Sequence, residues 1–158
     1  MDTLLDVHNQ VIRNVIRNQC FSKAGLAEGT NANTIKTAAP NGAGVDYSVN
    51  GVLYHKADTD NITMTACAAQ ADLSTCYYLI TINAPGTVTI TKGTEKLTSG
   101  NTFTVDDLPD QPDDSCVIGL MKIVTSGGTF TSGTTDLSGT GVTDTFYDLA
   151  CYPTSLPG

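Results

Sequence analysis

The sequence predicts a mainly β protein: a β-sandwich or small β-barrel body that follows an N-terminal amphipathic α-helical arm. Threonine and glycine supply 25 and 15 of the 158 residues, and they favour strands and turns, respectively. Short runs of apolar residues lie between turn sequences, as in sandwiches and barrels. Only the first twenty residues have the three- and four-residue spacing of a helix. The mass of 16.5 kDa suits one domain with an arm.

Acidic residues outnumber basic ones by 16 to 8, which gives a net charge of −8. Phosphate backbones repel such a chain, so we expect no nucleic-acid partner. We interpret the acidity as a source of solubility, with electrostatic steering as the alternative. No stretch approaches the ~18 apolar residues of a membrane span. Acids also occupy the N-terminus, where a secretory leader is basic. We therefore expect assembly in the cytoplasm and no membrane partner.

Residues 1–21 form the predicted arm. Apolar side chains recur there at the spacing of one helical face, and Arg13 and Arg17 lie on the opposite face. The resulting apolar stripe consists of Leu4, Val7, His8, Val11, Ile12, Val15 and Ile16. Such a helix is marginal alone in water, so the stripe must pack either on the chain's own β-domain or on neighbouring subunits. A membrane surface is a poor partner because the polar face has only two basic residues.

Residues 22–44 are small, polar and rich in turn-forming types, with one possible short strand at 33–37. This composition predicts either a linker that sets the arm apart or an ordinary long surface loop. The β-rich domain then occupies residues 45–158.

Two β-hairpins open the domain. Apolar residues alternate on both sides of Asn50-Gly51, a pair that tolerates the positive φ angles of a two-residue type I′ turn. The second hairpin joins residues 77–82 to residues 87–91 through a turn at 83–86. Its first strand is continuously apolar, which predicts a more central position in the sheet than that of its partner.

Two further units are expected toward the C-terminus. Residues 117–124 form a strand that pairs with residues 129–131 across a turn at 126–128. Residues 142–149 form a last strand before a proline-containing end. Strands this short, with turn signals between them, favour the sandwich or small barrel.

The segment most similar to a metal site is the loop at residues 106–114, which has five aspartates in nine positions. Calcium needs several converging oxygen ligands, which closely spaced carboxylates could supply. The loop lacks the spacing and the closing Glu of a dedicated calcium loop. We therefore interpret it as a solvated loop and predict no metal ligand.

No catalytic or cofactor-binding residue is predicted. The two histidines are His8 on the arm and His55 beside the first hairpin, and common nucleophile, phosphate-binding and zinc-protease motifs are missing from the sequence. The five cysteines lack CxxC spacing, so we expect free, mostly buried thiols in a reducing compartment. Cys20, close to Arg17 and Lys23, is the thiol most open to activation. The sequence thus supports no enzyme.

Three segments resemble virion structural proteins of tailed bacteriophages, especially those of the head decoration or cement type. They are VNGVLYHKADTDNI, YYLITINAPGTVTITKGT and PDDSCVIGLMKIVTSGGTFTSGTTDLSGTGVTDTFYDL. Together they span most of residues 45–149. The resemblance implies a β-rich protein on the outside of an icosahedral capsid, assembled in the host cytoplasm and without catalytic residues.

The resemblance and the residues together indicate a capsid cement or decoration protein. Its expected partners are the major capsid protein, which it bridges on the outer surface of the shell, and further copies of itself. The apolar stripe of the arm is the expected docking element. A tail-fibre or adhesin-type receptor-binding module is the alternative, although six Tyr and no Trp offer little material for an aromatic sugar-binding platform. A hydrolase would need a cleft with His or paired carboxylates.

Overall fold

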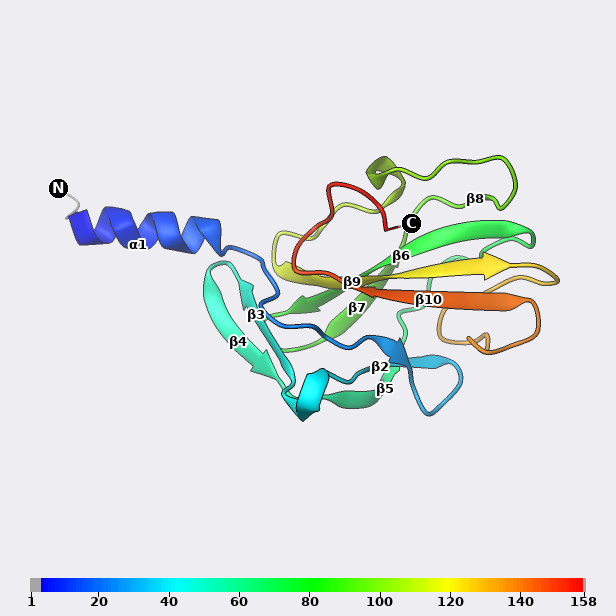
Figure 1. The fold of residues 1–158 in the computed structure, drawn as a ribbon, viewed down its shortest axis with the longest axis horizontal. Coiled ribbons are helices and arrows are strands. Elements are labelled where there is room, and N and C mark those ends of the chain that lie inside the picture. Colours follow the sequence, from blue (N-terminus) through cyan, green and yellow to red (C-terminus); the bar gives the residue numbers. More distant parts are fainter. Residues whose placement is uncertain (1–3, 158) are drawn as a thin grey trace.

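A computed structural model describes residues 4–157 of the chain, with side chains from Asp6 onward. Helix α1 (Leu4–Val15) projects from one end of a body built from strands (Figure 1). The predicted fold class, a mainly β body with an N-terminal helical arm, is confirmed. Two short 3₁₀ turns, Pro40–Gly42 and Val105–Asp107, interrupt the connections between strands.

The largest sheet forms the middle of the body. Its strands follow the order β10-β9-β6-β7, and β8 pairs with the start of β6. All of these pairs are antiparallel. The strands are β6 (Ser74–Asn83), β7 (Val88–Lys92), β8 (Lys96–Leu97), β9 (Ser115–Thr125) and β10 (Val142–Asp148).

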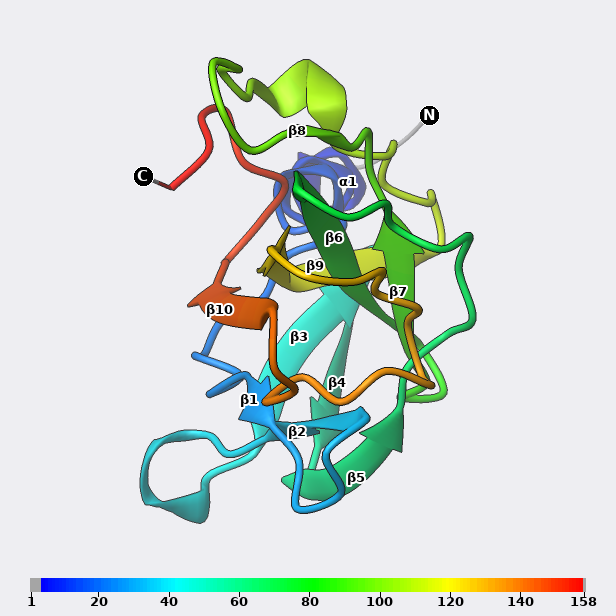
Figure 2. The same cartoon turned by 90° about the vertical axis from the view of Figure 1, so that its right-hand side faces the viewer.

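Two smaller sheets cover one face of this middle sheet. One has the order β1-β2-β5 and the other is the β3–β4 hairpin. In Figure 2 the strands β1, β2 and β5 lie on one side of the middle sheet, and β8 and the C-terminal segment lie on the other. The bounds are β1 (Ala27–Glu28), β2 (Thr34–Thr37), β3 (Val45–Val49), β4 (Val52–Lys56) and β5 (Thr59–Thr63).

The core consists of one apolar layer on each face of the middle sheet. On β6, Tyr78 and Ile80 point into the larger layer beneath the small sheets, while Tyr77 and Leu79 point into the other. Because both faces are covered, residues 74–82 of β6 are all buried. This confirms the prediction that the continuously apolar strand is central, since such runs are typical of strands buried on both sides.

The β3–β4 hairpin has the predicted turn. Val49 pairs with Val52, and the two residues between them have positive φ angles, 52° at Asn50 and 74° at Gly51. Both angles are those that a type I′ turn requires.

The expected pairing of residues 117–124 with residues 129–131 is wrong. The edge of β9 is instead taken by β10, and Phe130 makes only an isolated bridge to Gln70. The Phe130 ring is fully buried and contacts Tyr78 edge to face, with 5.8 Å between ring centroids. The position of residues 129–131 is therefore set by burial of the Phe130 ring in the core, and not by pairing with β9.

Residues 22–44 are not a simple linker. They contain β1 and β2, and Ala24, Leu26 and Ile35 belong to the larger core layer. Cys20, which the sequence places within the arm, is also buried in this layer. The arm that stands apart from the body is therefore shorter than the predicted 1–21 and ends close to the last turn of α1.

Candidate functional site

The base of the arm is fixed to the body through main-chain hydrogen bonds. The Gly51 amide donates to the Arg17 carbonyl (2.9 Å), and the Ser48 amide donates to the Gln19 carbonyl (2.7 Å). The Phe21 amide in turn donates to the Asp46 carbonyl (2.8 Å). Residues 17–21 thus lie along the free edge of β3, and this arrangement fixes where α1 leaves the body (Figure 1).

The apolar stripe of α1 is open to solvent. Val7, Val11, Ile12 and Val15 are 46%, 54%, 44% and 65% exposed. His8 is also exposed, and Ile16 is half-buried. Leu4 begins the helix, but its side chain lies outside the part that the structure describes. The alternative in which the stripe packs on the chain's own β-domain is therefore wrong for the described residues.

Exposed large apolar side chains gather at the arm end of the molecule. Among the residues whose side chains are described, nine such side chains are exposed. Two of these lie apart from the rest: Leu97 is on β8, and Leu73 directly precedes β6, whose start pairs with β8 at the end of the body away from α1 (Figure 1). The other seven form what we call the attachment end: Val7, Val11, Ile12, Val15, Phe21, Val52 and Leu53. Such clustering is typical of interaction surfaces, whereas isolated exposed apolar residues are not informative.

A groove of about 400 Å³ lies at the base of the helix, between the arm and the β3–β4 hairpin. It is lined by Ile16, Phe21, Asp46, Tyr47, Leu53 and Tyr54. Tyr47 and Tyr54 stack with 5.7 Å between ring centroids. Because Ile16 belongs both to the stripe and to the groove, the two form one apolar surface.

Charge is distributed unevenly between arm and body. Residues 4–17 carry Arg13 and Arg17 against Asp6, a net charge of +1, whereas residues 18–158 carry six basic and 14 acidic residues, a net charge of −8. Arg17 and Asp113 form an ion pair at 4.0 Å, and both side chains are largely exposed. Such a pair adds little stability, so main-chain hydrogen bonds, and not this pair, fix the base of the arm.

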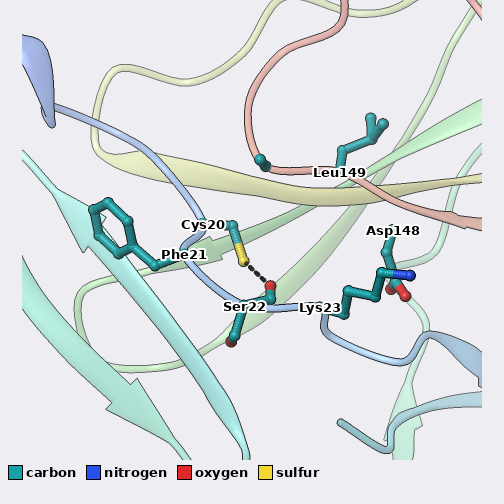
Figure 3. A pocket seen from close by; sticks show the side chains of 7 residues that line it. Cys20, Phe21, Ser22, Lys23, Asp148 and Leu149 are labelled. Carbon is teal, nitrogen blue, oxygen red and sulfur yellow. Dashed lines mark hydrogen bonds between the residues drawn. The ribbon is translucent and has the colours of Figure 1, made fainter. Parts of the chain in front are cut away.

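A second cavity, which we call the Cys20 pocket, lies beside the same segment (Figure 3). It has a volume of about 260 Å³ and is lined by residues 20–23 and residues 148–150. The Cys20 thiol donates a hydrogen bond to the Ser22 carbonyl (2.9 Å), and the Cys20 amide donates to the Ala150 carbonyl (2.7 Å). The pocket therefore forms where the arm base meets the chain that follows β10.

The pKa of the Cys20 thiol is lowered from its ordinary value. Interaction with the Cys116 side chain is the main cause, burial opposes it, and the Ser22 backbone adds to it. The pKa of Cys116 is raised by the same interaction and by burial. Arg17 and Lys23, the basic residues close to Cys20 in the sequence, are not among the causes of its lowered pKa.

Two of the five aspartates in residues 106–114 have structural partners elsewhere in the chain. Asp107 accepts hydrogen bonds from the Lys96 ammonium group (2.7 Å) and the Thr104 amide (2.8 Å). Asp113 is the partner of Arg17. Among the described residues, no three His, Cys, Asp or Glu side chains are grouped so that they could hold a metal ion. The absence of a metal site stays a prediction, and this structure gives no support for a calcium loop.

The histidines do not form a catalytic arrangement with a nucleophile in the part of the chain described. His8 is on the projecting helix, whereas His55 on β4 lies 2.8 Å from the Asp46 carboxylate across the hairpin. Both side chains of the His55–Asp46 pair are more than half exposed. The pair is therefore a surface contact.

Comparison with known proteins adds no relative: the chain matches no protein-family profile, no curated protein sequence and no solved structure. No helix within residues 4–157 is long and apolar enough to cross a membrane.

Proposed function

We propose that this protein is a structural protein of a tailed-bacteriophage virion: a decoration or cement protein that binds the outer surface of the head. In this role it bridges neighbouring major capsid proteins and also contacts further copies of itself. The observation that carries the proposal is the exposed apolar stripe on a helix that projects from the body. A helix of 12 residues is marginal alone in water, so this stripe needs a partner surface.

The attachment end supplies the binding energy. Burying one large aliphatic side chain is worth roughly 1.5–3 kcal/mol, and the stripe offers Val7, Val11, Ile12 and Val15 together. The groove at the helix base extends this surface toward Leu53. The arm has little net charge of its own, so it can approach a partner while the acidic body stays outside. Many such contacts on one shell would hold modest individual interfaces in place.

We propose no catalytic activity, no cofactor and no nucleic-acid partner. The net charge of −8 opposes contact with packaged DNA. The protein would assemble in the host cytoplasm and act on the capsid exterior, a placement that follows from the segments that resemble decoration proteins. The alternative is a receptor-binding module of a tail fibre.

Copy number separates these two proposals. Virions of the phage that encodes this chain are purified, and the chain is quantified against the major capsid protein by mass spectrometry. Hundreds of copies per particle are expected for a decoration protein. A handful of copies would favour the tail-fibre module and contradict the cement role.

The cement role is tested by adding the protein back to stripped heads. Heads that lack the protein should release DNA at a lower temperature than heads that have rebound it. The variant Leu97→Asp, altered at the opposite end of the body, should protect the heads as well as the unaltered chain. Equal DNA release from stripped and rebound heads would overturn the bridging role.

A further inference from the structure

One edge of the β3–β4 hairpin, the outer edge of β4, is free. On the other edge, the main-chain groups of Ser48 and Asp46 bond to the arm base, residues 17–21, and so point away from β4. Leu53 and His55 are their partners in the hairpin register. In an antiparallel pair, opposite residues that do not bond to each other both point outward. The N–H and C=O groups of Leu53 and His55 therefore line the free edge, and no other segment of residues 4–157 forms a main-chain hydrogen bond with them.

Neither a proline nor a bulge protects this edge. β4 pairs with β3 in regular register over five residues, and its one permanently charged residue, Lys56, lies at the end of the strand. Leu53 is 66% exposed and Val52 is 51% exposed. The outer edge of β7, by comparison, is covered, because the Ile90 amide donates to the Thr65 hydroxyl (3.1 Å). An uncovered apolar edge is a template for pairing with another strand.

We propose that β4 of one copy pairs antiparallel with β4 of a second copy, about a two-fold axis at Tyr54. In this register Leu53 lies opposite His55 of the second copy, and each of the two Leu53–His55 pairs exchanges two main-chain hydrogen bonds. Tyr54 meets its own counterpart at a position without hydrogen bonds, where opposite side chains lie closest. The contact closes on itself, as in an isologous dimer, and joins the two hairpins into one four-stranded sheet.

Charge favours this face and the antiparallel direction. Residues 45–56 carry Asp46 and Lys56, a net charge of zero, and residues 4–17 carry a net charge of +1, whereas the whole chain carries −8. Two copies can therefore meet at this end without the repulsion that opposes contact between their other faces. Parallel pairing would place Lys56 beside its own counterpart, whereas the antiparallel register places it opposite Val52.

The same register brings opposite charges together beyond the ends of the strands. When it is extended past Val52, Asp58 of the second copy falls beside the Asn50-Gly51 turn. At this turn the Gly51 amide donates to the Arg17 carbonyl, and Arg17 and Asp58 are both exposed. A surface pair of this kind adds little affinity, but it favours this register over a shifted one.

Pairing also covers the groove at the base of the arm. Leu53 and Tyr54 form part of the groove wall, together with Ile16 from the end of the apolar stripe. The hairpin of the second copy lies beside β4 and so shields these side chains from solvent. Charges placed in the stripe next to Ile16 would therefore weaken the pair, because part of the stripe is buried with it.

The pair explains how a chain with one arm can bridge two capsid proteins. In an antiparallel pair the two hairpin turns lie at opposite ends of the four-stranded sheet. Each turn holds the base of its own arm through the hydrogen bond from Gly51 to Arg17 (Figure 1). The pair therefore presents one apolar stripe at each end. This bridging role rests on the proposed function, whereas the pairing itself does not.

The mass of the full chain in solution tests the pairing. Sedimentation equilibrium is measured from about 1 µM to about 1 mM, a range that includes weak protein–protein contacts. We expect the mass to rise from 16.5 kDa to twice that value and no further. Leu53→Lys should weaken the pair by about tenfold or more, because lysine on an edge strand blocks strand pairing. Leu97→Lys is the matched control: Leu97 is 63% exposed on β8, and this variant should pair like the wild type.

Cysteine cross-linking tests the register, in a Cys151→Ser background that removes the exposed native thiol. Tyr54→Cys should form a disulfide-linked dimer, because Cα atoms at such a position lie about 4.5 Å apart, within the range of a disulfide. Val52→Cys alone should not, because the two copies of position 52 lie about 14 Å apart in this register. A mixture of Val52→Cys and Lys56→Cys should give the mixed dimer.

A chain that keeps a mass of 16.5 kDa at the highest concentration would overturn the proposal. Equal weakening by Leu53→Lys and Leu97→Lys, masses beyond the dimer, or dimers of Val52→Cys alone would overturn it as well. Stripped heads separate the pairing from the proposed function: pairs that form but never bind heads leave the pairing intact and remove the capsid role. Full protection of heads by Leu53→Lys would keep the capsid role and remove the bridging role of the pair. The wild-type mass needs no variant, so a variant that fails to fold leaves the test intact.

Discussion

The Gly51 amide on the hairpin turn donates a 2.9 Å hydrogen bond to the Arg17 carbonyl at the end of the arm. The hairpin turn therefore holds in place the chain that directly follows α1. A Cβ atom placed on Gly51 would lie 2.9 Å from both the Cβ atom and the carbonyl oxygen of Arg13. The type I′ turn thus does two things: it closes the β3–β4 hairpin, and it leaves room for the last turn of α1.

Gly51→Ala should displace the arm. The residue has a φ angle of +74° and no space for a side chain, so we expect a stability loss of about 1–2 kcal/mol and faster tryptic cleavage after Arg13 and Arg17. Gly42→Ala is the matched control because Gly42 has a φ angle of +67° and nothing within 4 Å of an added Cβ. It should cost stability without changing cleavage of the arm. Equal cleavage rates in the two variants would contradict this account.

The β-hairpins could be predicted because their signals are local. The Asn50-Gly51 turn and the continuously apolar strand around residues 77–82 each specify a structure within a few positions. The segment at 22–44 could not be predicted in this way. Its two short strands depend on β5 and on core contacts of Leu26 and Ile35, which distant parts of the chain supply. Small polar sequences of this kind are ambiguous without that context.

Part of the candidate site could likewise be predicted from local sequence, and part of it could not. The spacing of seven residues near the N-terminus predicts the apolar stripe of α1. It does not predict that this stripe is exposed to solvent. The Cys20 pocket has no sequence signal, since it brings residues 20–23 together with residues 148–150, which are distant in the chain and belong to no motif. The groove is likewise a product of packing, because it combines the end of α1 with both strands of the hairpin.

Asp107 should make stability depend on pH in the acid range. Its pKa lies below the ordinary value, chiefly because of the hydrogen bond from Lys96 and then that from the Thr104 amide. A group with a lowered folded pKa stabilises the protein above its unfolded pKa, near 3.9, and that stabilisation is lost as the pH falls below it. The melting temperature of the wild-type protein should therefore fall between pH 5 and 3 more than that of Asp107→Asn.

At pH 7 Asp107→Asn should lower stability by about 1–3 kcal/mol, because a buried charged acceptor is removed. Asp113→Asn is the control: its side chain is 98% exposed and 4.0 Å from Arg17, so we expect a change below about 0.5 kcal/mol. Parallel pH profiles for wild-type protein and Asp107→Asn would refute the assignment.

Gln70 should be the most sensitive buried polar position. It is fully buried. Its side-chain Nε2 donates hydrogen bonds to the carbonyls of Ser74 (3.2 Å) and Ile123 (3.1 Å), and its Oε1 accepts one from the Tyr78 hydroxyl (3.1 Å). Gln70→Leu leaves the Tyr78 hydroxyl without this partner and removes the hydrogen bonds to the Ser74 and Ile123 carbonyls, although Ser74 keeps the one from the Thr125 hydroxyl. We therefore expect a loss of about 2–4 kcal/mol in urea unfolding. Adding Tyr78→Phe should recover part of the loss, because one unpaired group is removed. A double variant less stable than Gln70→Leu would contradict this.

The arm gives the prediction that separates docking from folding. Val11→Asp/Val15→Asp places two charges in the stripe, where burial against a partner would make them costly. Gln10→Asp/Arg13→Gln lowers the net charge of the same helix by the same two units, but on its polar face. Because Val11 and Val15 are exposed, both variants should keep the melting temperature of the β-body.

Only the stripe variant should then lose attachment to stripped heads and self-association, measured by co-sedimentation and light scattering. If the stripe instead packed on its own domain, the stripe variant alone would melt lower, by about 2–4 °C for each 1 kcal/mol lost. Normal binding by the stripe variant would remove the arm from the attachment surface. Loss of binding by both variants would point to the net charge of the arm, because both lower that charge by two units and they differ in which face of α1 is altered.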